Sequence, residues 1–331
     1  MTSIKPSQFD ARTERWPIAG AFTISRGAKT EAVVVIAEIT RDGVTGRGEC
    51  VPYARYNETP DGVLGAIEAM RQSLLRGLDR AALQSAMPPG AARNAIDCAL
   101  LDLEAKQSGR RAWELLGVAA PIAATTAYTI SLGTPAAMAK AAAKAATRAL
   151  LKIKLGGDGD EDRIAAVRRA APNSELIVDA NEAWTPGNLA RNLAACADAG
   201  VTLVEQPLPA GNDDALATIR RPIPVCADES VHARDSLEAL RGRYDAINIK
   251  LDKTGGITEA IAMAQAAQAL GLDIMIGCMV ATSLAMAPAM LLTPHARFVD
   301  LDGPLLLAKD RPNGLRYEAS TVYPPEPTLW G

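Results

Sequence analysis

Five ionisable residues follow one another through the middle of the chain at nearly equal intervals. They are Lys154, Asp179, Glu205, Asp228 and Lys250, each 22 to 26 residues after the last (154 to 179, 179 to 205, 205 to 228, 228 to 250). Such an interval accommodates one β-strand with its helix. Because a parallel barrel brings the carboxyl ends of all its strands to one rim, the order base, three acids, base predicts one reaction site there.

The three acidic residues predict a metal site. Carboxylates that meet inside a protein repel one another and are costly to bury, and a divalent cation relieves both effects. Asp179, Glu205 and Asp228 include no His or Cys among them, so the donor set suits a hard ion, and we expect Mg²⁺. Glu229 adjoins Asp228, and these residues alone leave open which of the two binds the metal.

Strand alternation places the charged side chains on an inner face. Successive side chains of a strand point to opposite faces. In the segment 150–155 the apolar residues Leu151, Ile153 and Leu155 share one face, while Lys152 and Lys154 share the other. We expect the apolar face to meet helices, which leaves both lysines pointing into the barrel.

The elements that would position these residues form an α/β pattern. Eight strands are expected, at Thr125–Ser131, Leu150–Leu155, Leu176–Asn181, Leu203–Pro207, Val225–Glu229, Ala246–Leu251, Asp273–Cys278 and Phe298–Asp302. Ala-rich segments such as 135–150 and 258–270 have the length and propensity of outer helices. A doubly wound open sheet is the competing architecture, but it would gather functional groups at one switch point rather than on nearly every strand.

The first part of the chain has a different pattern. The segment 31–49 has an apolar alternating run and a turn at Asp42-Gly43, which predicts an antiparallel hairpin, and helical patterns follow at 60–75 and 90–108. We therefore expect an α+β domain over residues 1–118 and a barrel over 119–303. The polar, Pro-rich segment 304–331 is expected to pack back on the first domain.

Composition excludes several classes of protein. The 331 residues carry a net charge of −3 and 48% hydrophobic residues, with no basic run interleaved with aromatics, so we expect no nucleic-acid partner. The segment 1–15 is charged and lacks an apolar core, so neither a secretion signal nor a membrane anchor is expected there, and a cytoplasmic location is the default. A homo-oligomer is compatible with this composition.

The five cysteines predict reduced core thiols. Cys50, Cys98, Cys196, Cys226 and Cys278 are widely spaced, with no CxxC pair. Cys226 and Cys278 fall on expected strands near the rim, where a nucleophile could act. The chain has only two histidines and neither is in a recognisable pairing with a cysteine, which favours the core interpretation.

The charged positions stand in motifs that resemble a known family. The motifs are Lys152-Ile153-Lys154, Asp179-Ala180-Asn181, Val204-Glu205-Gln206-Pro207, Ala227-Asp228-Glu229-Ser230 and Asn248-Ile249-Lys250. Together they resemble the muconate-lactonising subgroup of the enolase superfamily, and most closely its dipeptide epimerases of the L-Ala-D/L-Glu type. The resemblance covers the whole chain and implies a modified TIM-type (β/α)7β barrel with an N-terminal capping domain.

This resemblance implies roles for the rim residues. Mg²⁺ bound by Asp179, Glu205 and Asp228 would stabilise an enediolate, and alternation within the motif favours Asp228 over Glu229 as the ligand. Lys154 and Lys250, nearly opposite across an eight-stranded ring, would be the two bases of a 1,1-proton transfer. Lys152 would polarise the substrate carboxylate. Asn181 and Glu229 are similar to residues that orient the metal ligands or Lys250.

The resemblance also suggests a substrate, and Ser25-Arg26-Gly27, Glu49-Cys50-Val51-Pro52-Tyr53 and Asp300-Leu301-Asp302 carry this part of it. In the family the last motif binds a free amino group, and two carboxylates on one strand face would attract an ammonium. Arg26, in a Gly-flanked loop, is expected to bind a glutamate side chain, because the guanidinium matches a carboxylate. Thr129 resembles a substrate contact, although the sequence alone would make it strand filler.

Several functions fit these residues. The expected function is Mg²⁺-dependent epimerisation of a dipeptide of the L-Ala-Glu type; a hydrophobic or cationic dipeptide stays open, because Arg26 alone indicates an acidic one. An N-acylamino-acid racemase, an o-succinylbenzoate synthase or a cycloisomerase would share the fold, but their substrates lack the free ammonium that Asp300 and Asp302 would attract. An aldolase barrel that forms a Schiff base on Lys154 or Lys250 would not need three carboxylates, and a barrel that only binds a ligand would not need both lysines.

Overall fold

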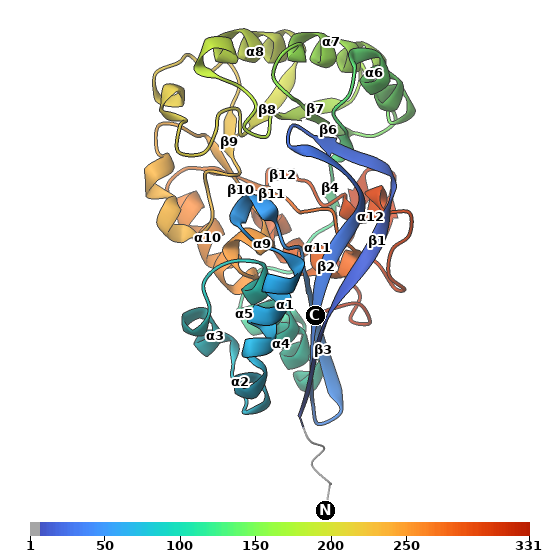
Figure 1. The fold of residues 1–331 in the computed structure, drawn as a ribbon, viewed down its shortest axis with the longest axis vertical. Helices are drawn as coiled ribbons and strands as arrows, with labels where there is room; N and C mark the ends of the chain where they lie inside the picture. The colour runs from blue at the N-terminus through green and yellow to red at the C-terminus, as the bar shows by residue number, and fades with distance from the viewer. Residues whose placement is uncertain (1–6) are drawn as a thin grey trace, which may run out of the picture.

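A long antiparallel hairpin joins the two parts of the molecule (Figure 1). The computed structural model describes residues 7–331. The segment 1–15, in which no targeting signal is expected, therefore lies partly outside the described residues. Strand β1 (Gln8–Ile24) pairs with β2 (Gly27–Arg41) on both sides of an irregularity between Pro17 and Phe22, and β2 pairs in turn with β3 (Val44–Cys50). The β2–β3 hairpin confirms the prediction, whereas β1 is an additional strand that the sequence analysis missed.

Five helices complete the capping domain. They are α1 (Pro60–Ala69), α2 (Arg71–Leu75), α3 (Arg80–Ala86), α4 (Ala91–Ser108) and α5 (Ala112–Leu116). The single helix expected over 60–75 divides at Met70, which ends α1 and precedes α2. The long helix α4 packs on β2 and β3 around Val35, Ile96 and Leu100, which are buried in one apolar cluster.

Eight parallel strands form the second part. The short strand β4 (Ala124–Thr125) precedes them and belongs to another sheet. The eight strands are β5 (Tyr128–Ile130), β6 (Leu150–Lys154), β7 (Glu175–Asp179), β8 (Val201–Glu205), β9 (Val225–Ala227), β10 (Ala246–Ile249), β11 (Asp273–Ile276) and β12 (Phe298–Val299). Strands β5 to β12 pair in chain order. Because no strand order reverses, the open doubly wound sheet is excluded.

The sheet curls until its ends meet. Thr126, which precedes β5, forms a parallel bridge with Val299 of β12, and the amide of Ala127 donates to the Val299 carbonyl at 2.8 Å. Eight side chains from successive strands fill the interior: Ala127, Leu150, Ile177, Leu203, Cys226, Ala246, Met275 and Phe298. The predicted barrel with a capping domain is thus confirmed, and its interior is packed below the rim.

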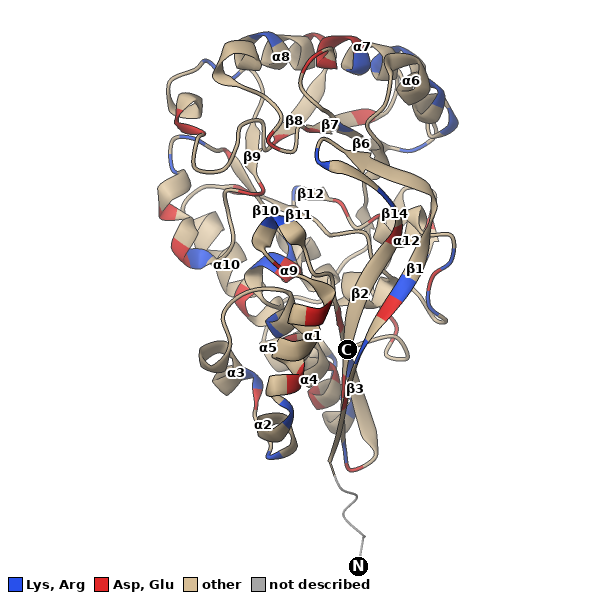
Figure 2. Ribbon diagram, viewed as in Figure 1, with Lys and Arg blue, Asp and Glu red and all other residues tan. Residues whose placement is uncertain are grey.

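Helices cover the outside of the barrel unevenly. Those around the barrel are α6 (Pro135–Lys144), α7 (Asp160–Ala170), α8 (Pro186–Asp198), α9 (Leu251–Thr254), α10 (Ile257–Ala269), α11 (Ser283–Ala289) and α12 (Gly303–Leu306). After β8 and β9 the chain returns through 3₁₀ turns, η2 (Asp214–Ala217), η3 (Arg234–Ser236) and η4 (Glu238–Leu240), and a further one, η5 (Met290–His295), follows α11. Charges of both signs lie on α7 and α8, whereas the charged residues of α6 are all lysines (Figure 2).

The last segment touches both parts. Strand β13 (Tyr317–Glu318) pairs with β14 (Thr321–Val322), and β14 pairs with β4, which directly precedes the barrel strands. The chain end then reaches α4, where the Trp330 indole donates to the Cys98 carbonyl at 3.1 Å and the Gly331 amide donates to Asp102 at 2.8 Å. Across residues 7–331, none of the helices combines the length and apolar character needed to cross a membrane.

Two glycines allow β3 to lie directly against α4. A β-carbon on Gly48 would overlap the Ala95 carbonyl oxygen and lie 2.9 Å from the Ala99 amide, and one on Gly46 would overlap the Ala99 carbonyl. These are backbone atoms of a buried helix, which cannot move aside as a flexible side chain would. The close approach of strand and helix therefore requires glycine at both positions.

We predict that Gly48→Ala lowers the free energy of unfolding by about 3 kcal/mol, because overpacking against backbone forces α4 away from β3. Urea denaturation followed by circular dichroism measures this change. The matched control is Gly65→Ala in α1, where an added β-carbon meets nothing within 4 Å. Since alanine favours a helix interior, this control should raise stability by about 0.5 to 1 kcal/mol. Equal effects of the two substitutions would contradict the packing account.

Candidate active site

Lysine and carboxylate side chains from neighbouring strands lie in one row at the carboxyl end of the barrel. Lys154, Asp179 and Glu205 are the last residues of β6, β7 and β8, and strand register pairs Lys154 with Asp179 and Asp179 with Glu205. Asp228 and Lys250 each follow directly on the next two strands, β9 and β10. The structure thus brings together all five residues whose spacing predicted a shared rim.

Unusual backbone follows two of these strand ends. Asn181 and Gln206, just beyond β7 and β8, have positive φ angles of 44° and 36°. Non-glycine residues with such angles cost about 1 to 3 kcal/mol each and occur where the surroundings fix them. Here the Gln206 side chain accepts the amides of Asp228 and Ser230 at 2.8 and 3.0 Å, so the turn after β8 holds the turn after β9.

Lys152 and Lys154 lie among the carboxylates. The Lys152 ammonium lies 2.7 Å from Asp300, 3.3 Å from Asp179 and 2.6 Å from Glu205, and the Lys154 ammonium lies 2.6 Å from Asp179. Burial lowers the pKa of Lys152, but Asp300, Glu205 and Asp179 raise it more, leaving it well above its ordinary value. Lys152 therefore carries a fixed positive charge in this arrangement.

On the other side of the rim, the Asp228 carboxylate accepts hydrogen bonds from two lysines. Lys250 donates to one carboxylate oxygen at 2.7 Å, and Lys253 donates to the other at 2.6 Å and to the Asn248 carbonyl at 2.9 Å. The sequence analysis missed Lys253. A signal for it was present, because Lys253 lies three residues after Lys250, one helical turn away, in the short helix α9.

The charge pairs set the protonation of the rim. Burial alone would raise the pKa of both Asp228 and Asp179, but the charges of neighbouring lysines lower it more. The pKa of Asp228 is therefore well below its ordinary value, and the pKa of Asp179 is lowered to about 2. Burial also lowers the pKa of Lys250, while Asp228 and then Glu205 raise it well above the ordinary value. Glu205 is different, because burial and the nearby Asp179 raise its pKa despite Lys152.

The carboxylates suit a divalent cation by their chemistry. Among residues 7–331, no three His, Cys, Asp or Glu side chains lie close enough to hold an ion as they stand, and lysine ammonium groups contact oxygens of all three carboxylates. Yet the amide oxygen of Asn248, whose amide nitrogen donates to Glu205, is buried without a hydrogen-bond donor. Three buried carboxylates and a free amide oxygen form the kind of oxygen donor set that Mg²⁺ prefers.

A second carboxylate pair lies across the barrel from Asp228. Asp300 and Asp302 follow β12, and both are buried. Asp302 accepts the amide of Thr129 at 2.7 Å, and burial followed by the charge of Asp300 raises its pKa to about 7. The predicted contact residue Thr129 therefore meets this pair through its backbone. An ammonium between the two carboxylates would restore their charge balance.

Arg26 ties the tip of the hairpin to the barrel. One terminal nitrogen donates to the Asn181 carbonyl at 3.0 Å and to Glu182 at 3.2 Å, and the other donates to the Tyr53 hydroxyl at 3.0 Å and to Glu229 at 2.7 Å. Arg55 adds a bidentate pair with Glu182 at 2.8 Å. The structure thus brings Arg26, Asn181 and Glu229 together as one clamp, which we call the hairpin clamp.

The two parts of the molecule enclose a cavity of about 860 Å³. It is lined by Lys154, Thr129, Asp228, Lys250, Asp300 and Asp302 from the barrel and by the hairpin segment 26–33 and the segment 51–60 from the capping domain. A cavity of this size accommodates a small molecule, and its barrel wall carries the charged residues described above. We therefore assign the candidate active site to this cavity.

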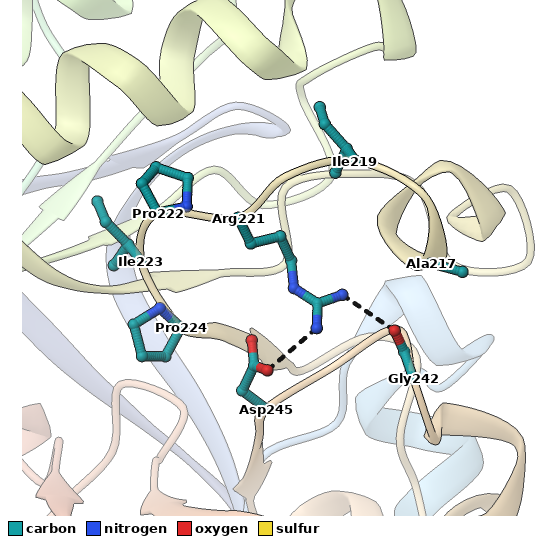
Figure 3. Close-up of a pocket in the computed structure, with 8 residues that line it drawn as sticks. All are labelled: Ala217, Ile219, Arg221, Pro222, Ile223, Pro224, Gly242 and Asp245. Carbon is teal, nitrogen blue, oxygen red and sulfur yellow. Dashed lines mark hydrogen bonds and ion pairs between the residues drawn. The ribbon is translucent and has the colours of Figure 1, made fainter.

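A second hollow lies on the outside of the barrel (Figure 3). It surrounds Arg221, whose guanidinium donates to the Gly242 and Arg243 carbonyls at 3.1 and 2.8 Å and to Asp245 at 3.1 Å. Its donors are satisfied by the loops that it joins. This hollow therefore has a structural explanation and offers no cluster of reactive groups.

The cysteines behave as core thiols. All five are free, and four are fully buried. Cys226 belongs to the apolar interior of the barrel, and Cys278 lines the cavity beside Asp300 and Asp302. Burial, followed by nearby carboxylates, raises the pKa of both thiols well above the ordinary value, so neither supplies a thiolate.

Comparison with protein families matches both parts of the chain. Residues 8–117 match the mandelate racemase/muconate lactonizing enzyme N-terminal domain, and residues 136–327 match the enolase C-terminal domain-like family. The two matches correspond to the capping domain and the barrel.

Two characterised relatives cover nearly the whole chain. An L-Ala-D/L-Glu epimerase of Escherichia coli K12 is 46% identical over 312 residues, which is 94% of this chain and 97% of the relative. An N-acetyl-D-glutamate racemase of a Pseudoalteromonas species is 47% identical over 301 residues, covering 90% and 94% of the two chains. Both names include glutamate.

Solved structures of similar proteins also cover nearly the whole chain. An enolase family member from Agrobacterium tumefaciens with homology to dipeptide epimerases, solved with sodium and L-Ala-L-Glu, is 55% identical with a TM-score of 0.97 and covers 98% of this chain and 100% of its own. A dipeptide epimerase from Enterococcus faecalis V583, solved with Mg and L-Leu-L-Tyr, is 31% identical with a TM-score of 0.89 and covers 98% and 97%.

We predict that Lys253→Met lowers the free energy of unfolding by about 3 kcal/mol, because it leaves a buried oxygen of Asp228 without its cation. The measurement is urea denaturation in a chelator, so that no metal ion takes the place of the ammonium. The control is Lys140→Met on the exposed side of α6, which should change stability by no more than about 0.5 kcal/mol. An unchanged stability for Lys253→Met would show that the Asp228 pairing is dispensable.

Proposed function

Since the chain belongs to the mandelate racemase/muconate lactonizing enzyme family of the enolase superfamily, we propose that it is a Mg²⁺-dependent dipeptide epimerase acting on L-Ala-Glu dipeptides. One observation carries the proposal: two lysines face the same cavity from strands four positions apart, and three carboxylates lie on the strands between them. The reaction is inversion at the α-carbon of the second residue.

Lys154 and Lys250 are the proposed bases. Strands β6 and β10 are second and sixth in the sheet of eight, so their ends lie on opposite sides of the rim. A substrate α-carbon held between them presents one face to each ammonium nitrogen. One lysine in its neutral form takes the α-proton, the other returns a proton to the opposite face, and the configuration inverts.

The proposed metal ligands are Asp179, Glu205 and Asp228. A divalent cation bound by them supplies electrostatic stabilisation of the negative charge that develops on the substrate carboxylate as the proton leaves. Asn248 donates to Glu205 at 2.8 Å and the amide of Asn181 donates to Asp179 at 2.9 Å, and these bonds fix the carboxylates in place. Lys152 adds a fixed positive charge beside the same carboxylates and is proposed to polarise the substrate carboxylate.

The substrate class follows from the remaining charges. Asp300 and Asp302 are proposed to bind the free amino group of the dipeptide, with Thr129 holding Asp302. Glutamate is proposed as the reacting residue because the relatives at 46% and 47% identity are both named for a reaction of glutamate. Contact of Arg26 with the glutamate side chain stays a prediction, as do a cytoplasmic location and assembly into a homo-oligomer.

Racemisation of an N-acylated glutamate is the second candidate. Its support is the 47% identity to an N-acetyl-D-glutamate racemase. The same two lysines and metal ligands would serve it, since only the group on the substrate nitrogen differs. The Asp300 and Asp302 pair favours the dipeptide, because an acylated nitrogen carries no positive charge to balance two carboxylates.

The test is proton NMR of L-Ala-L-Glu in D₂O with the purified enzyme and Mg²⁺. We predict loss of the glutamate α-proton signal and appearance of L-Ala-D-Glu, because proton return from solvent-exchanged lysine carries deuterium. Removal of the metal by EDTA should stop both changes, and added Mg²⁺ should restore them.

Other outcomes separate the alternatives. Faster exchange of N-acetyl-L-glutamate than of L-Ala-L-Glu would favour the racemase. Borohydride trapping of a covalent lysine adduct would indicate the Schiff-base barrel. Retention of the α-proton in both substrates with Mg²⁺ present would contradict the proposed function.

A further inference from the structure

A short helical turn, α9, follows directly on Lys250. The Lys250 carbonyl accepts the amides of Lys253 and Thr254 at 3.0 and 3.1 Å, so the turn begins from Lys250 itself. Side chains of this turn point in two directions. Lys253 reaches into the barrel to Asp228, whereas Asp252 reaches away from it to the capping domain. The backbone of Lys250 is therefore held in place by contacts that α9 makes on both sides.

One carboxylate oxygen of Asp252 joins α9 to two parts of the capping domain. It accepts the backbone amide of Val51 at 3.0 Å and the side-chain amide of Asn94, in α4, at 2.8 Å. All three residues are buried. Val51 directly follows β3 and begins the segment 51–60, which is part of the capping-domain wall of the cavity. Asp252 thus connects this wall with Lys250, which lines the same cavity two residues earlier in the chain.

Helix α4 holds the end of the turn through a different residue. Figure 1 shows α9 between strand β10 and the helices of the capping domain. Arg93 of α4 donates to the Thr254 carbonyl at 2.7 Å and to the Gly255 carbonyl at 3.0 Å. These bonds do not involve Asp252, so α9 keeps a contact with α4 when Asp252 is replaced. The contact that Asp252 adds is the one that reaches the cavity wall.

The contact of Asp252 depends on an oxygen atom rather than on a negative charge. Burial raises the pKa of Asp252 to about 7, although the Val51 amide and Asn94 lower it. Both donors meet the same oxygen, and the side-chain oxygen of an asparagine also has two lone pairs to accept them. Asparagine has nearly the same shape as aspartate, so it can preserve both hydrogen bonds. Alanine would leave the Val51 amide and Asn94 buried without this acceptor, which is costly.

We propose that Asp252 is a positioning residue for Lys250, because it fixes the turn that carries this lysine against the capping-domain wall of the cavity. The inference rests on the proposed function, in that Lys250 is one of the two proposed bases. The other, Lys154, ends β6 on the opposite side of the rim, away from α9. Replacement of Asp252 therefore disturbs one base and leaves the other in place.

The test measures α-proton exchange in D₂O with Mg²⁺, started separately from L-Ala-L-Glu and from L-Ala-D-Glu. In Asp252→Ala, kcat for exchange of one epimer should fall about tenfold to a hundredfold, because small displacements of a catalytic group have effects of this size. This epimer is the one that Lys250→Ala no longer exchanges. Exchange of the other epimer, which uses Lys154, should change little. Asp252→Asn should keep both rates near those of the unmodified enzyme.

Asp102→Ala is the matched control. Asp102 is also buried and also accepts two backbone amides, those of Arg47 and Gly331 at 2.8 Å, but it does not line the cavity. This control should lower stability without separating the two epimers. A merely structural role of Asp252 predicts the same behaviour. Equal changes for both epimers in Asp252→Ala would therefore overturn the inference.

Asn94→Ala keeps the inference testable if Asp252→Ala does not fold. It removes one of the two donors to Asp252 and leaves the Val51 contact in place. Exchange of the Lys250-dependent epimer should again fall, by a smaller factor, while exchange of the other epimer is kept. An equal effect on the two epimers, or no effect on either, would contradict the proposed role.

Competitive labelling with acetic anhydride separates this inference from the proposed function. Mass spectrometry measures acetylation of Lys250 relative to that of Lys154, with EDTA present so that Lys250 pairs with Asp228. If the unmodified enzyme exchanges neither epimer, the proposed function fails, and the labelling ratio still judges Asp252. A ratio that rises in Asp252→Ala but not in Asp252→Asn would support its role, because a loosened turn exposes Lys250. A ratio that does not rise in Asp252→Ala would overturn it.

Discussion

The mutual repulsion of three carboxylates buried at one rim is the constraint on which the rest of the structure depends. Asp179, Glu205 and Asp228 are almost fully removed from water, and each would be costly to hold ionised alone. Four lysines on the same rim supply the opposite charge. Two of these four lysines, Lys154 and Lys250, are also the proposed bases, so in the proposed mechanism stability and reactivity share these two groups.

The capping domain completes what the barrel begins. The barrel supplies the charged wall and its rigid strand ends, whereas the hairpin and the segment 51–60 supply the opposite wall of the cavity. The hairpin clamp holds these walls together through Arg26 and Glu229. The division matters for specificity in the proposed mechanism, because the proposed bases lie on the barrel, whereas the opposite wall of the cavity belongs to a different part of the chain.

The sequence predicts the barrel and its charged rim well, because the pattern there is local and regular. Strand alternation around Lys152 and Lys154, and the equal spacing from Lys154 to Lys250, report geometry that any parallel barrel imposes. The sequence does not predict the partners of Arg26, since Glu182 and Glu229 lie 156 and 203 residues away. It also missed β1, in which Asp10, Arg12 and Glu14 form one charged face and Arg15 interrupts the apolar alternation on the other face.

The central claim is that Lys154 and Lys250 act on opposite faces of one α-carbon. The most direct measurement is α-proton exchange in D₂O with Mg²⁺ for Lys154→Ala and Lys250→Ala, started separately from L-Ala-L-Glu and from L-Ala-D-Glu. The account predicts that interconversion falls at least about a thousandfold in each variant, while each still exchanges the proton of one epimer and the two variants exchange opposite epimers. Interconversion at the unmodified rate in either variant, or exchange of the same epimer by both, would contradict it.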